Sequence, residues 1–99
     1  MSQFDVYAGV GRSNRLVVDL QSDILGPIAT RIVAPLLQRS ETPVLTELTP
    51  LVRLEGRDFV VMIPLLASIP VRELQRPVGS LISDQDVIKR ALDALFLGF

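Results

Sequence analysis

The sequence contains no cysteine and no histidine among its 99 residues. The absence of cysteine excludes a disulfide framework and a thiolate metal site. The absence of histidine removes the commonest general base and the commonest metal ligand of proteins. Little catalytic material remains, so we expect a binding protein rather than an enzyme, with no cofactor and no bound metal.

The charges of the chain are balanced, and it has no long apolar run. Lysine and arginine number 10 against 11 acidic residues, which gives a net charge of −1 at pH 7. This balance does not favour a grip on nucleic-acid phosphates, so we expect no direct nucleic-acid binding. No window approaches the roughly 20 apolar residues of a membrane helix, and the first residues lack the pattern of a signal peptide. We expect a cytoplasmic protein with no membrane partner.

What the sequence does contain is apolar material for one domain spanning residues 1–99. Hydrophobic residues make up 48% of the chain, which is too apolar for disorder. Residues 3–10 alternate between apolar and other side chains and predict a strand with one buried face. The glycine-rich stretch 9–14 then turns the chain, and residues 15–20 predict the partner strand. The expected buried face consists of Phe4, Val6, Ala8 and Val10, opposite Asp5, Tyr7 and Gly9.

Further strands are expected in the middle of the chain. Residues 31–37 form an apolar run in which Pro35 lacks an amide donor, so we expect Pro35 at an edge, a bulge or a strand end. Residues 51–55 and 59–63 flank residues 56–58, a pattern typical of a tight hairpin.

The apolar segment 65–71 contains Pro70 and predicts a short edge strand or an extended approach to one. Five or six short strands joined by short turns predict a small, partly open antiparallel barrel. The fold class is therefore mainly β, followed by one C-terminal helix.

The helix is indicated by apolar residues at spacings of three and four. Ser83, with Asp86 three residues later, predicts a capping box at its start. The apolar stripe expected to face the sheet consists of Val87, Ile88, Ala91, Leu92, Leu95 and Phe96. The opposite, solvated face consists of Asp86, Lys89, Arg90 and Asp93.

Two apolar stretches raise the question of a binding role. At the end of the chain, Leu97 continues the polar face and should point outward, and Gly98 is suited to the positive φ that ends a helix. Phe99 then either packs back against the helix or stays free for a partner. In the loop at residues 21–28, we expect Ile24 and Leu25 to pack beneath the loop, with exposure to a partner as the alternative.

Stretches along almost the whole chain are shared with a known family. The most specific is VDLQSDIL at residues 18–25, since a polar Gln-Ser-Asp run between apolar pairs is not a generic strand pattern. The other matching residues are Gln3, Phe4, Val6, Tyr7, Arg15, Leu16, Arg31, Val33, Pro35, Leu36, Ala67, Ser68, Pro70, Val71, Ile88, Lys89, Ala91, Phe96 and Gly98. With these residues the chain resembles the CcdB family of plasmid and chromosomal toxins.

The resemblance implies a homodimer of small SH3-like barrels, the type shared by the CcdB, Kid and MazF toxins. It also implies a toxin of a type II toxin–antitoxin system that binds the DNA gyrase A subunit, traps the cleaved gyrase–DNA complex and is neutralised by a CcdA-like antitoxin. An acidic antitoxin segment would lie across an exposed strand or apolar groove, assisted by Arg12 and Arg15. The gyrase contacts implied by the resemblance are Ile24, Leu25, Asp93, Phe96, Leu97, Gly98 and Phe99.

The tail departs from the best-known family pattern, which has Asn in place of Asp93 and Trp-Gly-Ile in place of residues 97–99. Loss of the Trp removes a cation–π contribution of roughly 0.5–2 kcal/mol. This corresponds to about two- to thirtyfold in affinity, unless Phe99 restores an aromatic contact. We therefore expect a gyrase poison of altered strength or altered target range.

Two other functions stay open. An endoribonuclease of the Kid and MazF type needs acid–base groups, which Asp19, Asp23 and Arg31 could supply, although such residues more often form a structural ion pair. The second is an inactive relative that binds the antitoxin and regulates its operon.

Overall fold

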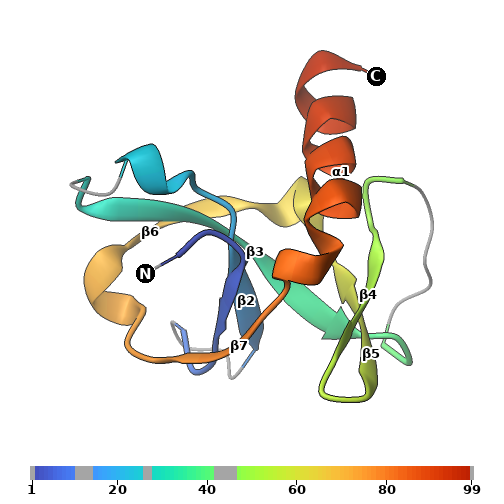
Figure 1. Cartoon of the computed structure of the whole chain (residues 1–99), viewed down its shortest axis with the longest axis horizontal. Helices are drawn as coiled ribbons and strands as arrows, with labels where there is room; N and C mark the ends of the chain where they lie inside the picture. Colours follow the sequence, from blue (N-terminus) through green and yellow to red (C-terminus); the bar gives the residue numbers. More distant parts are fainter. Residues whose placement is uncertain (1, 11–14, 26–27, 42–46, 99) are drawn as a thin grey trace.

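The computed structural model describes residues 2–10, 15–25, 28–41 and 47–98, which fold into one curled antiparallel sheet and one α-helix (Figure 1). The helix, α1, spans Gln85–Leu97. The strands are β1 Asp5–Tyr7, β2 Leu16–Asp19, β3 Thr30–Gln38, β4 Leu51–Leu54, β5 Arg57–Val61, β6 Ala67–Pro70 and β7 Pro77–Ser80. Single 3₁₀ turns are η1 Asp23–Leu25, η2 Ile63–Leu65, η3 Val71–Glu73 and η4 Ile82–Asp84. The prediction of a mainly β half-barrel with one C-terminal helix is confirmed.

Strand β3 connects the two halves of the sheet. The strand order is β4-β5-β3-β2-β1-β7, and β6 pairs with the first half of β3 as the predicted short edge strand. Residues 30–33 of β3 pair with β6, and residues 36–38 pair with β5. Pro35 lies between these segments, where β3 changes partner, so its missing amide interrupts neither ladder. It lies inside a strand, rather than at the edge, bulge or strand end that we expected.

The β4–β5 hairpin is tighter than predicted. Glu55 and Gly56 have φ values of 52° and 79°, and Leu54 pairs directly with Arg57. Two consecutive residues with positive φ are typical of a two-residue turn that matches the twist of its strands. Arg57 and Asp58, which we expected in the turn, therefore belong to β5.

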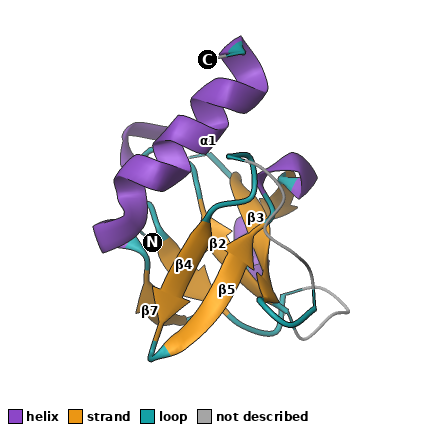
Figure 2. Cartoon of the chain, turned by 90° about the vertical axis from the view of Figure 1, so that its right-hand side faces the viewer, coloured by secondary structure: helices purple, strands orange, loops and turns teal. Residues whose placement is uncertain are grey.

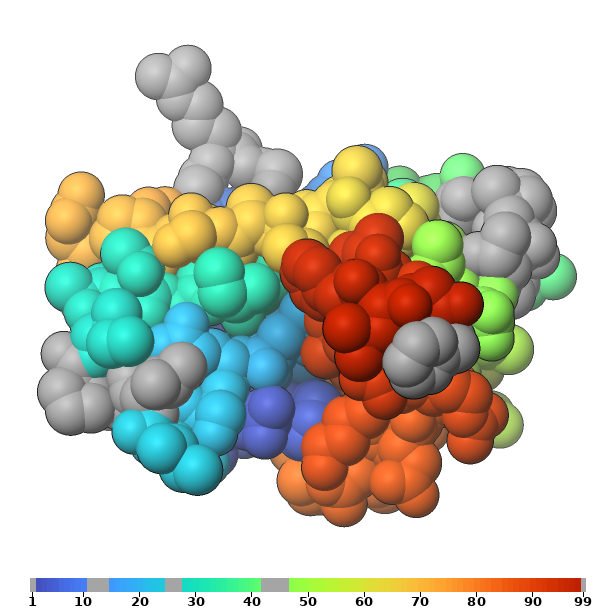
Figure 3. Space-filling view, turned by 90° about the horizontal axis from the view of Figure 1, so that it is seen from above, coloured from blue at the N-terminus to red at the C-terminus, as the bar shows by residue number. Residues whose placement is uncertain are grey.

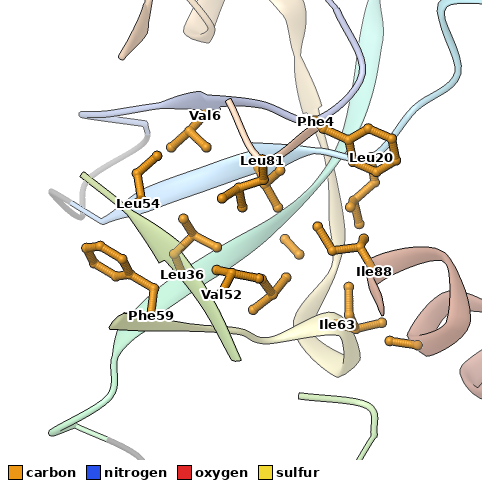
Figure 4. Close-up of a cluster of buried hydrophobic side chains, with 14 residues drawn as sticks. Phe4, Val6, Leu20, Leu36, Val52, Leu54, Phe59, Ile63, Leu81 and Ile88 are labelled. Atoms are coloured by element: carbon orange, nitrogen blue, oxygen red, sulfur yellow. The ribbon is translucent and has the colours of Figure 1, made fainter. Parts of the chain in front are cut away.

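The main core lies between the concave face of the sheet and α1 (Figures 2 and 4). Ile88 and Ala91 of the helix are fully buried against it. Each large apolar side chain buried in this way contributes about 1.5–3 kcal/mol. The core holds the first half of α1 firmly on the sheet. The cluster consists of Phe4, Val6, Val18, Leu20, Ala34, Leu36, Val52, Leu54, Phe59, Val61, Ile63, Leu81, Ile88 and Ala91.

A second, smaller core covers the opposite face of β1, β2 and β3. Tyr7, Val17 and Val33 are buried there together with Leu74, which follows η3. The prediction that Tyr7 faces solvent is wrong, because the segment after β6 crosses this face. Ala8, predicted to be buried, is exposed. Alternation along β1 therefore separates two cores, with Val6 in one and Tyr7 in the other.

Strand β7 was not predicted. It pairs with β1 and brings Gly79 so close to β4 that a Cβ atom on Gly79 would lie 2.8 Å from Leu54 Cδ1. The two edges of the curled sheet meet at this glycine.

The start of α1 differs from the predicted capping box. Ser83 lies within η4, and Asp84 occupies the N-cap position without a side-chain hydrogen bond. The amide of Asp84 already donates to the carbonyl of Leu81 at 2.9 Å. The 3₁₀ turn thus leads into the helix without a side-chain cap.

Candidate functional site

The second half of α1 rises away from the sheet (Figures 1 and 2). Leu95 still packs partly on the core, but Phe96 is 67% and Leu97 61% exposed. The prediction that Phe96 faces the sheet is wrong, because the helix extends beyond the surface on which that stripe could pack. The prediction that Leu97 points outward is confirmed. The helix end therefore presents two large apolar side chains.

The helix ends at Gly98, as predicted. Its φ is 80°, and its amide donates to the carbonyl of Ala94 at 3.1 Å. Asp93 is exposed, and the last turn contains no basic residue. Because the carbonyl end of a helix is partially negative, Asp93 adds negative charge to a negative terminus. Phe99 lies outside the described residues.

Ile24, in the turn η1, is the most exposed large apolar residue described, at 89%. The prediction that it packs beneath its loop is wrong; for Leu25 the side chain lies outside what is described. Figure 3 shows η1 and the end of α1 on the same face of the molecule. Leu65, in the turn η2 that packs against α1, is 57% exposed. We name Ile24, Phe96 and Leu97 the apolar face.

Beneath η1, Arg31 and Asp19 form a buried ion pair. Arg31 Nη2 donates to Asp19 Oδ2 at 2.6 Å, and Arg31 Nε donates to the same oxygen at 3.0 Å. Both side chains are at most 2% exposed. Burial lowers the pKa of Arg31, but the hydrogen bonds and the charge of Asp19 raise it by more. The pKa of Arg31 therefore lies above its usual value. The structural ion pair that we expected is present.

Gln21, to which we assigned no role from its sequence, completes this cluster. Its carbonyl accepts from Arg31 Nη2 at 3.0 Å, and its Oε1 accepts from the Ile32 amide at 3.1 Å. Tyr7 is buried nearby, and burial together with the carboxylates of Asp5 and Asp19 raises its pKa. The polar run that follows β2 could have signalled this cluster, because a buried charge needs several partners.

A groove of about 580 Å³ opens on another side of the molecule. Arg15 lies at its rim and donates to Glu41 at 3.3 Å, and the guanidinium of Arg57 lies 5.6 Å from the centre of the Phe59 ring. The Gln38 amide and Arg15 hold the pKa of Glu41 below its usual range. Arg12 lies outside the described residues. The groove is lined by Arg15, Leu16, Leu36, Gln38, Glu41, Arg57 and Phe59.

The described ranges contain neither a metal-binding cluster of side chains nor a membrane-spanning helix. No group of three acidic side chains there could hold a metal ion. None of the helical residues described forms a segment long and apolar enough to cross a membrane.

The curled antiparallel sheet with one protruding C-terminal helix is the fold that the resemblance to the CcdB family implied. The family described as "CcdB protein" matches residues 3–98, so the chain belongs to the CcdB family. This confirms the resemblance and makes the chain a toxin-type protein whose partner is an antitoxin. The chain is also similar to a solved structure described as "Crystal structure of Mtb toxin", at 24% identity and a TM-score of 0.71, over 88% of this chain and 98% of that one. At that identity the similarity supports the fold.

Proposed function

We propose that this protein binds the A subunit of DNA gyrase and traps the cleaved gyrase–DNA complex, acting without catalysis of its own. The observation that carries this proposal is the exposed helix end, where Phe96 and Leu97 leave more than half of their surface uncovered. Exposed apolar side chains grouped on one face are typical of an interaction surface. The gyrase contacts carried over from the family include both residues, with Ile24 on the same face.

Charge at the helix end supports a cationic contact on the partner. Asp93 and the uncompensated carbonyl terminus of α1 are both negative. Of the other positions carried over from the family, Gly98 ends the helix, and Leu25 and Phe99 complete the proposed contact set.

The endoribonuclease alternative is disfavoured by burial. Asp19 is 0% and Arg31 1% exposed, and each is the principal partner of the other. A nuclease needs its acid, base and cationic groups within reach of the RNA. Of the three candidate residues, only Asp23, which is 57% exposed at its side chain, is accessible, and one carboxylate does not provide that set.

An assay with purified protein, gyrase, supercoiled DNA and ATP distinguishes three functions, namely a gyrase poison, an inactive relative and a nuclease. A gyrase poison yields linear cleaved DNA. An inactive relative that only regulates its operon leaves the DNA uncleaved and does not bind gyrase A at micromolar concentration. A nuclease degrades RNA in the absence of gyrase.

Leu97→Trp is expected to strengthen binding to gyrase A. The indole can stack on a cationic side chain of the partner, which contributes roughly 0.5–2 kcal/mol, or about two- to thirtyfold in affinity. Calorimetry on a gyrase A fragment measures the gain. The control is Leu97→Met, which conserves volume without adding a ring. Equal affinities for the Trp and Met variants would contradict an aromatic contact at this position.

We propose that the antitoxin segment occupies the groove beside Arg15. Its apolar floor and the guanidinium groups of Arg15 and Arg57 suit an acidic peptide with apolar anchors. In the free protein Arg15 is already paired with Glu41. An antitoxin carboxylate must therefore compete with Glu41.

Glu41→Gln is expected to tighten antitoxin binding by about two- to fivefold, the scale of one exposed ion pair. Acidification does not imitate this substitution, because the pKa of Glu41 is lowered and its ion pair is lost only as pH falls through that lowered value, where the carboxylates of the peptide are already protonated. The effect is measured as the affinity of the protein for the antitoxin peptide that binds it, at constant ionic strength. Asp86→Asn, which changes net charge equally on α1, serves as the control. Unchanged or weaker binding by the Glu41 variant would place the antitoxin elsewhere.

We propose a homodimer acting in the cytoplasm, where gyrase is found. A two-fold toxin presents two helix ends to the two-fold gyrase A dimer. Light scattering should give twice the chain mass, and a monomer mass at micromolar concentration would contradict the dimer.

A further inference from the structure

The guanidinium of Arg31 joins the core to the turn that carries Ile24. Its Nη2 donates to Asp19 Oδ2 at 2.6 Å, to the carbonyl of Gln21 at 3.0 Å and to Asp23 Oδ1 at 3.5 Å. Asp19 is buried, whereas the side chain of Asp23 is 57% exposed. One buried cation therefore reaches from strand β2 to the first residue of η1.

Asp23 in turn ties η1 to the start of the chain. Its Oδ1 accepts from the Gln3 amide at 2.8 Å, and Gln3 Nε2 donates to the carbonyl of Leu20 at 2.9 Å. The amide of Ile24 donates to Ser22 Oγ at 3.3 Å. Polar contacts thus hold the turn on both sides.

Ile24 contributes no apolar anchor to its own turn, since 89% of the residue is exposed. A segment with few buried apolar contacts opens at low free energy unless other interactions order it. A segment that must become ordered on binding loses affinity. The hydrogen bonds of Arg31 and Asp23 are therefore placed where they can keep this turn ordered before binding.

We propose that Arg31 and Asp23 are positioning residues, which hold η1 in the conformation that presents Ile24 to the partner. The proposal rests on the proposed role of Ile24 in gyrase binding. A buried ion pair contributes little net stability, because apolar residues of similar volume pack equally well. An apolar pair cannot bind the Gln21 carbonyl or the Asp23 carboxylate. Positioning of η1 is therefore a function that the buried charge can perform and an apolar pair cannot.

Asp23→Ala tests this proposal with little risk to folding, because the side chain is half exposed. The amide of Ile24 should exchange its hydrogen at least about tenfold faster, the scale of one lost charge-assisted hydrogen bond. Asp23→Asn keeps an oxygen for the Gln3 amide and should give an intermediate rate. The matched control is Asp58→Ala, since Asp58 is an aspartate of similar side-chain exposure, 53%, paired with Arg53. The control should leave the exchange of Ile24 unchanged.

Binding to gyrase A adds a second measurement. Asp23→Ala should weaken it about three- to tenfold in the wild-type background and have no effect in an Ile24→Ala background, because the two residues then act through one contact. Unchanged exchange at Ile24 would overturn the proposal, as would equal losses of affinity in the two backgrounds. If the wild type does not bind gyrase A, the proposed function fails, while the exchange measurement still decides whether Asp23 orders η1.

Discussion

Phe96→Ala will weaken binding to the gyrase A subunit by about thirtyfold, while the melting temperature stays within about 3 °C of the wild type. Phe96 is 67% exposed, so truncating its ring removes little buried surface from the folded protein. An aromatic side chain at the centre of a contact commonly contributes 2 kcal/mol or more to binding. Calorimetry with a gyrase A fragment and a thermal melt of each variant measure the two quantities.

Ile82→Ala is the matched control for this substitution. Ile82 is 51% exposed and precedes α1, at the end of the helix opposite Phe96. It should retain wild-type affinity. Equal losses for the two variants would show that exposed apolar area in general, rather than the helix end, determines binding. A fall of more than about 10 °C for Phe96→Ala would show that its ring belongs to the core.

Asp19→Ala will lower the free energy of unfolding by about 3–5 kcal/mol. The substitution leaves Arg31 charged and 1% exposed, with its closest acceptor removed. Natural domains have about 5–15 kcal/mol of stability in total, so this loss is a large fraction. Urea unfolding monitored by circular dichroism measures it. A loss below about 1 kcal/mol would show that water or Asp23 replaces the missing partner.

The double variant Asp19→Leu with Arg31→Met removes both charges of the pair. Replacing both members of a buried pair by apolar residues is often neutral or stabilising. Stability should therefore return close to the wild type, while the hydrogen bonds to Gln21 and Asp23 remain lost. Asp58→Ala, which breaks the exposed pair with Arg53, should change stability by less than about 1 kcal/mol.

The β4–β5 hairpin and the helix were predictable, because both pack apolar residues against the main core. Residues 51–61 form the expected hairpin with a tighter turn, and Ile88 and Ala91 lie on the expected face of α1. Strand β7 was missed because Pro77 and Gly79 interrupt its pattern. Its position depends on pairing with β1 and on the close approach to Leu54, which are long-range contacts.

Errors about buried faces have a similar origin. Helical periodicity places Phe96 in the apolar stripe, but periodicity does not show where the sheet beneath the helix ends. Tyr7 was expected in solvent because nothing in β1 itself indicates that the segment after β6 crosses its outer face. The exposure of Ile24 follows from a turn held by buried polar groups, and a local apolar pattern contains no information on those groups.

Helix register alone placed Leu97 outward, but the assignment of gyrase contacts came only through resemblance. VDLQSDIL, at residues 18–25, contains Asp19 and Gln21 of the buried cluster, the half-exposed Asp23 that Arg31 also contacts, and Ile24 of the apolar face. The specificity of that motif now has a physical interpretation, since Asp19, Gln21 and Asp23 accept hydrogen bonds from Arg31, and Ile24 is presented to solvent.

Cleavage of supercoiled DNA by gyrase is the most direct test of the proposed function. With ATP, gyrase and the purified protein, we expect linear DNA to accumulate with toxin concentration after detergent and protease treatment. The Phe96→Ala variant should require about thirtyfold more protein for the same yield. Absence of linear DNA at every concentration up to tens of micromolar, with no binding to gyrase A, would contradict the account.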